Sequence, residues 1–245
     1  NRDIDNDDPY LPMLWWWAVE KQSVAGREEV LKRFVRPTLW KSRLGRDHLL
    51  PRLVRRYAAE RLMAGLDAVV RLLKAAPSDA ARDALWPQIL TGWTEQPRGA
   101  DDWLARVRQH DLFALAHRAW LAAPTDMTLL QLGLALGDRD PVDAAIRDAL
   151  DMRQPAARRA ALLGVLSPVV DPTLAPRLLA VAEAEEPEAV RVAAVQLLGR
   201  VELREQPELP RRLVKLHQAV KSPALQSQIR DALLGRASSA RVWLE

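Results

Sequence analysis

Pro187-Glu-Ala-Val-Arg-Val-Ala-Ala-Val-Gln-Leu-Leu-Gly199 is the stretch that decides the predicted fold, because its pattern recurs along the second half of the chain. Its apolar residues follow the 3.6-residue period of a helix. A proline suits the first turn of a helix, where its missing N–H costs no hydrogen bond. Residues of the same kind stand at the same offsets from Pro155, a looser copy follows Pro223, and a fainter one follows Pro124.

The four copies begin 31, 32 and 36 residues apart, somewhat closer than the ~40 residues of a two-helix HEAT repeat. Small alanines in each copy allow paired helices to approach closely, and a pair of leucine or similar residues fills the layer between pairs. The sequence therefore predicts an all-α fold, an α-solenoid of HEAT-like antiparallel helix pairs, with the regular repeats in residues 123–245.

The rest of the chain is also expected to be helical. Gly is scarce, with 10 in total, Ala, Leu and Arg are abundant, and no runs of alternating β-formers occur. Pro, Gly and Asp/Ser clusters delimit the expected helices, which lie near 9–21, 26–35, 47–60, 61–75, 78–91, 100–109, 111–122, 125–136, 140–151, 155–166, 172–184, 187–200, 207–220 and 222–235. Residues 1–122 hold eight of the nine tryptophans, and we expect them to form an irregular, Trp-rich and Arg-rich N-terminal cap.

Composition excludes several kinds of chemistry. The chain has no cysteine, which rules out disulfides, thiolate catalysis and covalent attachment of a c-type haem in this segment. No apolar run approaches the ~18–20 residues of a membrane span. Paired catalytic carboxylates, a nucleophile elbow, a phosphate-binding loop and a dinucleotide-binding glycine motif are also missing. We therefore expect this segment to be non-catalytic.

Residues 7–20, Asp-Asp-Pro-Tyr-Leu-Pro-Met-Leu-Trp-Trp-Trp-Ala-Val-Glu, are the most distinctive stretch of the chain. They resemble a signature of large exported proteins of planctomycetes and their relatives, called putative membrane-bound dehydrogenases with a HEAT-repeat region and a c-type cytochrome. The likeness continues through Pro37–Trp40 and Arg52–Arg56, and loosely to Ser239–Trp243. This chain resembles the helical-repeat region of that family, without its N-terminal propeller and without its Cys-x-x-Cys-His motif.

The resemblance implies a role rather than a reaction. It implies a connecting helical module of an exported, periplasmic redox assembly, whose haem c would belong to a partner or to another part of a parent chain. No cofactor is expected in this chain. Other protein domains or subunits, with a c-type cytochrome among them, are the expected partners, and the parent assembly would resemble a dehydrogenase.

Three consecutive tryptophans, Trp15, Trp16 and Trp17, are candidates for a partner-binding face, because exposed tryptophan is a common interface anchor. Successive residues lie about 100° apart on a helix, so one side cannot bury all three. The alternative is a helix enclosed in its own cap, with Glu20 paired to an arginine. Trp243, beyond the last repeat, is a second candidate contact.

Arg52, Arg55 and Arg56 share a helix face within a basic segment, residues 27–61, that holds eleven Lys or Arg against four Asp or Glu. This face offers the alternative function, a helical-repeat protein that binds nucleic acid. The competing interpretation is an arginine-rich solvated face.

Metal sites have little support in the sequence. Asp3, Asp5 and Asp7 alternate as in a calcium loop, but such a loop needs Gly at position 8 and Glu at position 14, and the chain has Asp8 and Leu14. The alternative interpretation is an acidic linker that precedes a helix N-terminus, where negative charge is favourable. The four histidines show no metal-ligand spacing, so no metal site is expected.

Overall fold

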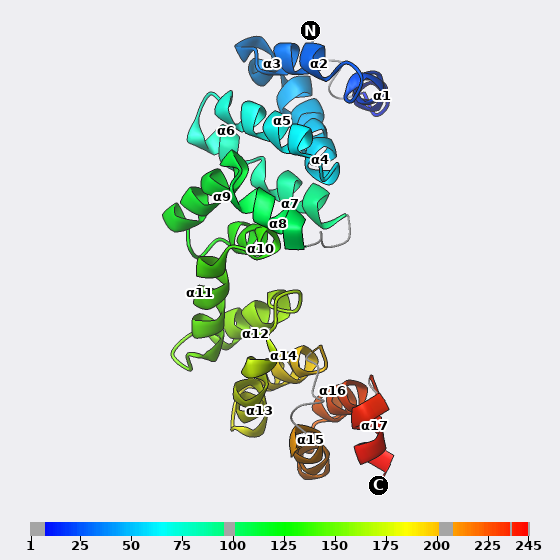
Figure 1. The fold of residues 1–245 in the computed structure, drawn as a ribbon, viewed down its shortest axis with the longest axis vertical. Helices are drawn as coiled ribbons and strands as arrows, with labels where there is room; N and C mark the ends of the chain where they lie inside the picture. The colour runs from blue at the N-terminus through cyan, green and yellow to red at the C-terminus, as the bar shows by residue number, and fades with distance from the viewer. Residues whose placement is uncertain (1–7, 96–100, 201–207, 236, 245) are drawn as a thin grey trace. The chain divides into compact units, whose positions relative to one another are not determined.

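The structure, a computed structural model, describes residues 8–95, 101–200, 208–235 and 237–244 (Figure 1). Helices account for the regular structure of these residues, and none of the described residues lies in a strand. The all-α class predicted from the sequence is thereby confirmed. The chain divides between residues 138 and 139 into two compact units, and this division falls one helix later than the expected 122/123 boundary.

Ten α-helices and one π-helical turn form the described part of the first unit. They are α1 (Leu11–Gln22), α2 (Arg27–Phe34), α3 (Pro37–Lys41), the π-helical turn η2 (Leu44–Leu49), α4 (Leu50–Ala59), α5 (Met63–Lys74), α6 (Asp79–Asp83), α7 (Trp86–Thr94), α8 (Asp101–Arg108), α9 (Asp111–Ala122) and α10 (Met127–Leu136).

Helix α4 is the centre of the first unit. It packs on α5, α7 and η2, and α7 in turn packs on α10, which also contacts α9. Five side chains of α4 are fully buried: Leu50, Leu53, Val54, Tyr57 and Ala58. A strongly amphipathic helix of this kind gains its stability from the burial of one apolar face.

Glycine at the α4–α7 contact allows the two backbones to meet. A Cβ atom on Gly92 of α7 would lie 2.2 Å from the carbonyl oxygen of Arg55 on α4. No side chain fits at that distance, so the close approach of these helices depends on Gly92.

Tryptophan supplies much of the first unit's core, as the clustering of indoles in this half suggests. Trp86 and Trp93 of α7 are each 2 % exposed, and Trp40, Trp120 and Trp16 are exposed by 9 % or less. The Trp93 indole Nε1 donates to the carbonyl oxygen of Ala135 at 3.2 Å, which satisfies its polar atom inside the core.

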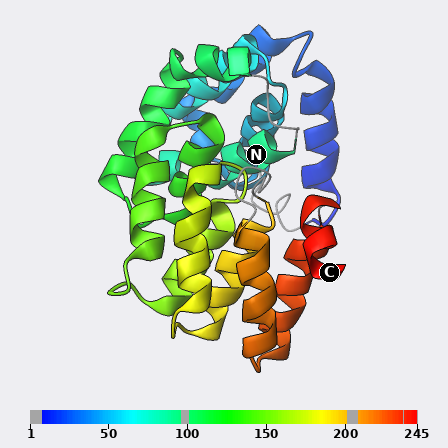
Figure 2. The same ribbon diagram turned by 60° about the horizontal axis from the view of Figure 1, so that its bottom comes forward.

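Helices of the second unit pack as consecutive pairs. The described elements are α11 (Arg139–Leu150), α12 (Ala156–Val165), the 3₁₀ turn η3 (Pro172–Leu174), α13 (Ala175–Glu183), α14 (Glu188–Leu198), α15 (Glu208–Ala219), α16 (Pro223–Leu234) and α17 (Ala237–Leu244). Within each pair, α11 packs on α12, α13 on α14, and α15 on α16. From pair to pair, α14 contacts both α12 and α16, and α13 contacts α15 (Figure 2).

The repeated arginine forms the same contact in two successive pairs. Arg159 at offset 4 from Pro155 donates its Nε to the carbonyl oxygen of Ala149, and Arg191 at offset 4 from Pro187 donates its Nε to that of Ala182. In the third copy, Gln226 donates to the carbonyl oxygen of Val220. Each side chain thus satisfies a carbonyl at or just beyond the C-terminal end of the preceding helix, where four carbonyls lack intrahelical partners.

The structure corrects several local expectations. Pro155 and Pro187 are N-cap residues that precede their helices, whereas Pro223 is the first residue of α16. The single helix expected over 78–91 is two helices, α6 and α7, because Pro87 lacks the N–H that a continuous helix would use. Helices α3 and α17 and the π-helical turn η2 were not expected.

No helix in the described part of the chain combines the length and the apolar character that crossing a bilayer requires.

Candidate protein-docking surface

Helix α1 begins at a carboxylate cap. The Asp8 side chain accepts hydrogen bonds from the backbone N–H groups of Tyr10 at 2.7 Å and Leu11 at 2.9 Å. The bond from Leu11, followed by that from Tyr10, holds the pKa of Asp8 below its ordinary value. Asp8 therefore stays ionised at the start of α1, where the helix dipole favours negative charge. Asp3, Asp5 and Asp7, the possible calcium ligands, lie outside the described residues.

The two sides of α1 differ in burial although both are apolar. Pro12 and Trp16 face inward, toward the elements that α1 contacts, α2 and η2, and Trp16 is only 9 % exposed. Among the three consecutive tryptophans, Trp16 therefore belongs to the core, while Trp15 and Trp17 are 51 % and 59 % exposed. Glu20 forms no ion pair among the described residues, so the expected pairing to an arginine is absent.

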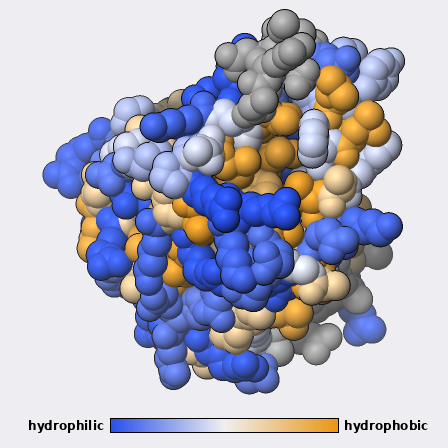
Figure 3. Space-filling model, turned by 90° about the horizontal axis from the view of Figure 1, so that it is seen from above, coloured by the Kyte–Doolittle hydropathy of each residue, from blue (hydrophilic) through white to orange (hydrophobic). Residues whose placement is uncertain are grey.

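The exposed apolar surface of α1, which we call the α1 face, is formed by Tyr10, Met13, Leu14 and Trp17 on one side of the helix and by Trp15 on another. These residues are exposed by 74, 40, 51, 59 and 51 %, respectively. Hydrophobic side chains gather at the surface at this end of the first unit (Figure 3). Taking ~200 Å² for a whole aromatic side chain, the three aromatic residues alone expose about 370 Å². Trp15 stands apart from the other four residues, so the contiguous patch of Tyr10, Met13, Leu14 and Trp17 is comparable to the largest patches of typical monomeric proteins.

Tyr10, Met13 and Leu14 belong to the α1 face but are not among the residues predicted from the sequence to bind a partner. Tyr10, Met13, Leu14 and Trp17 follow the i, i+3, i+4, i+7 spacing of a single helix face. That spacing was available in the sequence, but it does not tell which of two apolar sides of α1 faces solvent.

Arg52, Arg55 and Arg56 are committed to contacts within the first unit. Arg52 donates to the carbonyl oxygen of His48 at 3.0 Å, and the Arg55 Nε donates to Glu95 at 2.7 Å. Arg56 lies 3.6 Å from Glu60. This face is therefore largely neutralised. Exposed cations outside it, among them Lys21, Arg33, Arg36 and Lys41, form no ion pair among the described residues.

Trp243 belongs to the second unit and is half-buried. Its indole meets the His217 imidazole edge-on, with ring centroids 4.7 Å apart and planes at 84°, which places α17 on α15. Trp243 thus has an intramolecular partner and offers less free surface than Trp15 or Trp17.

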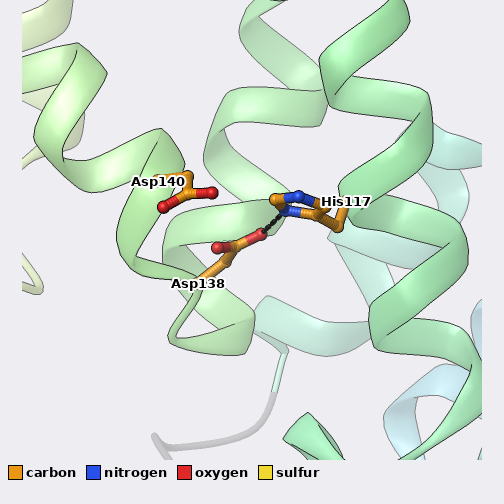
Figure 4. A group of neighbouring side chains, drawn as sticks. All are labelled: His117, Asp138 and Asp140. Atoms are coloured by element: carbon orange, nitrogen blue, oxygen red, sulfur yellow. Dashed lines mark hydrogen bonds and ion pairs between the residues drawn. The ribbon is translucent and has the colours of Figure 1, made fainter.

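A buried carboxylate and a histidine form the most notable polar pair of the first unit. His117 on α9 and Asp138, just beyond α10, join Nδ1 to Oδ2 at 2.7 Å, and the Asp138 side chain is 8 % exposed (Figure 4). Gly137, with φ of 76°, and the bond from the Asp138 N–H to the Gly133 carbonyl end α10 and direct Asp138 toward α9.

Asp140, also drawn in Figure 4, lies two residues further along the chain in the first turn of α11 and belongs to the second unit. The first unit by itself contributes only His117 and Asp138, fewer than the three protein ligands of even an open metal site. We therefore interpret the His117–Asp138 bond as a contact that ties α9 to the end of α10, and we assign no metal centre.

A hollow of the first unit is lined by carboxylates that have partners within the same unit. It has a volume of about 510 Å³ and lies beside α6 and α9. Asp79 pairs with Arg82 at 2.8 Å, and Asp83 accepts from the Trp86 indole at 3.1 Å. No side chain there is poised as a nucleophile beside a base.

No protein-family model, no curated protein and no solved structure matches the chain. The α1 face is consequently the feature that bears most directly on function.

Proposed function

We propose that the chain is a non-catalytic helical-repeat scaffold, an α-solenoid of HEAT-like helix pairs that mediates protein–protein contacts. The observation that carries the proposal is the α1 face, on which Tyr10, Leu14, Trp15 and Trp17 are each at least half exposed. Clusters of exposed aromatic side chains are the usual anchors of protein interfaces. A soluble monomer gains nothing from leaving them in water.

The pairing of helices in the second unit supports the solenoid part of the proposal. Successive pairs contact their neighbours in order. Within each pair, the side chain of Arg159, Arg191 or Gln226 on the second helix bonds a carbonyl at or just beyond the end of the first. Contacts restricted to neighbouring units are typical of repeat proteins, which present extended surfaces to their partners.

The resemblance of residues 7–20 suggests the setting of this scaffold. We propose a module or subunit of an exported, periplasmic assembly that resembles a dehydrogenase and contains a c-type cytochrome. Because the chain has no cysteine, haem c would be attached to the partner. The nucleic-acid alternative has less support, since Arg55 and Arg56 are paired with carboxylates of the same unit.

Site-specific photo-crosslinking tests the proposal. A benzophenone amino acid replaces Trp17 in the full chain, and the protein is exposed to a periplasmic extract of its source. We expect a defined adduct with another protein, and haem staining of that adduct would identify a c-type cytochrome.

The matched control carries the same probe at Met152, which is 73 % exposed and lies in the second unit. Adducts equal in pattern and yield from both positions would contradict the docking role of α1. In parallel, salt-sensitive retardation of DNA or RNA by the purified chain would favour the nucleic-acid alternative instead.

A further inference from the structure

Three exposed residues of α1 and Tyr10, the residue just before it, form a stripe whose spacing is the same in both directions along the chain. Tyr10, Leu14, Trp17 and Lys21 are separated by four, three and four residues. At 100° per residue they lie within about 60° of arc on the helix. All four are exposed, at 74 % for Tyr10, 51 % for Leu14 and 59 % for Trp17.

We propose that the α1 face binds a second copy of this chain, with the two α1 helices antiparallel about a two-fold axis. A stripe with palindromic spacing is self-complementary in this orientation. Leu14 then meets Trp17 of the partner subunit on both sides of the axis, and Tyr10 meets Lys21 of the partner subunit at both ends. Such an arrangement is the isologous interface of a closed dimer.

Charge favours a second copy as the occupant. Asp8 stands at the start of α1 and Lys21 near its end, so antiparallel pairing brings each carboxylate toward the opposite cation. The two helix dipoles also oppose each other. Lys21 has no ion pair among the described residues, and its ammonium group suits the face of a tyrosine ring.

The same charges disfavour the other occupants. Residues 8–22 contain Asp8 and Glu20 against Lys21, which gives this segment a net charge of −1. A helix that lies on an anionic lipid surface carries an excess of Lys and Arg beside its apolar face. An acidic partner helix would meet the same negative segment. A second copy, by contrast, supplies both signs in matching positions.

The area of the α1 face predicts a weak dimer. Pairing two copies covers about 530 Å² of aromatic surface from Tyr10 and Trp17, at ~200 Å² for a whole aromatic side chain, and the neighbouring side chains add to this. The total stays near or below the roughly 1,200 Å² at which stable interfaces begin, so we expect a reversible dimer with a Kd in the micromolar range.

Sedimentation velocity on the purified full chain, at about 1 to 300 µM, tests the inference around the expected micromolar Kd. The weight-average mass should rise from 27.5 kDa toward twice that value. Leu14→Glu should hold the protein at monomer mass, with an unchanged circular dichroism spectrum. The matched control is Leu121→Glu on α9, a leucine exposed by 56 %, which should dimerise like the parent protein.

Disulfide trapping tests the antiparallel orientation, and the absence of native cysteine makes the result unambiguous. A Leu14→Cys chain is mixed with a Trp17→Cys chain under mild oxidation. The mixed dimer should form faster than either homodimer, whereas a parallel arrangement would favour the two homodimers and overturn the proposed geometry.

A monomer at every concentration, or a dimer unaffected by Leu14→Glu, would overturn the inference. Binding of the monomer to phosphatidylglycerol vesicles, lost in Leu14→Glu, would also overturn it and identify a lipid surface as the occupant. The inference deepens the proposed docking role of α1, but the two can fail separately. A strict monomer that still crosslinks a partner through position 17 removes only self-association, and a dimer without such an adduct removes only the wider scaffold role.

Discussion

Removal of one partner from the buried ion pair Arg159–Glu186 should destabilise the second unit strongly. The two terminal guanidinium nitrogens, Nη1 and Nη2, donate to the carboxylate at 2.7 and 2.9 Å, and the two side chains are 3 % and 5 % exposed. The Arg159 Nε also donates to the Ala149 carbonyl at 3.0 Å. The single change Arg159→Met leaves a buried, uncompensated carboxylate and a carbonyl without its donor.

The expected magnitude follows from these contacts. Breaking a buried ion pair by removing one member costs about 3–5 kcal/mol. Both Arg159→Met and Glu186→Leu should therefore lower the free energy of unfolding by about 4 kcal/mol each. The double variant holds no buried charge and lacks only the bond to the Ala149 carbonyl, so its loss should be about 1–2 kcal/mol.

Urea unfolding, combined with hydrogen exchange of peptides from α12 and α14, measures these losses in the second unit. Arg153→Ala is the matched control, because Arg153 pairs with Asp151 at 2.9 Å but is itself 90 % exposed. An exposed pair contributes about 0–1 kcal/mol, so this variant should stay close to the parent protein.

Acid should remove the contribution of the pair. Arg159, through its hydrogen bonds, holds the pKa of Glu186 below its ordinary value of 4.5. A lowered folded-state pKa gives stability that is present above pH 4.5 and is lost as the pH falls through the folded-state pKa. The difference in stability between the parent protein and Glu186→Gln should accordingly shrink below pH 4.5. Single variants that each lose less than about 1 kcal/mol, or a double variant that loses the sum of the two, would refute the reasoning.

Two further predictions concern the first unit: the effect of a side chain at position 92, with Gly164→Ala as its control, and the titration of Tyr57. Gly92→Ala should lower stability by about 1–3 kcal/mol in urea unfolding, because its Cβ would lie 2.2 Å from the Arg55 carbonyl oxygen. Gly164→Ala in α12, where a Cβ meets nothing within 4 Å, should instead raise stability by about 0.5–1 kcal/mol; a gain at position 92 as well would contradict the packing argument. Burial raises the pKa of Tyr57 to about 12. In a Tyr10→Phe variant, which leaves one tyrosine, phenolate absorbance should appear near pH 12, with stability lost as the pH rises from 10 toward 12; a phenolate signal near pH 10 before unfolding would contradict burial of the Tyr57 hydroxyl.

Local patterns predicted most of the helices because helix formation depends on near neighbours. The helix expected over 111–122 matches α9, Asp111–Ala122, in both bounds. Those expected near 140–151 and 222–235 match α11 and α16 within a residue at each end. The patterns failed where chain geometry is irregular, as at the π-helical turn Leu44–Leu49, whose wider hydrogen-bonded ring has no signature in apolar spacing.

The candidate site was predicted only in part. The rarity of three adjacent tryptophans marked α1 as a packing or docking element. It did not show which of the three indoles is buried in the core and which are exposed to a partner. Burial of Trp16 beside exposure of Trp15 and Trp17 depends on which neighbours cover the helix. The bond between His117 and Asp138, 21 residues apart, likewise depends on how α10 ends against α9.

Periodicity and composition are properties of the chain alone, and they sufficed to predict that the chain is helical and that no cysteine chemistry is available. Tertiary structure decided which side of α1 faces solvent, which arginines are neutralised, and how Arg159 and Arg191 join successive helices. These outcomes rest on distances between residues far apart in the chain. Such distances are set by the packing of helices against one another, as where Gly92 lets α7 approach α4, and no local pattern of residues encodes them.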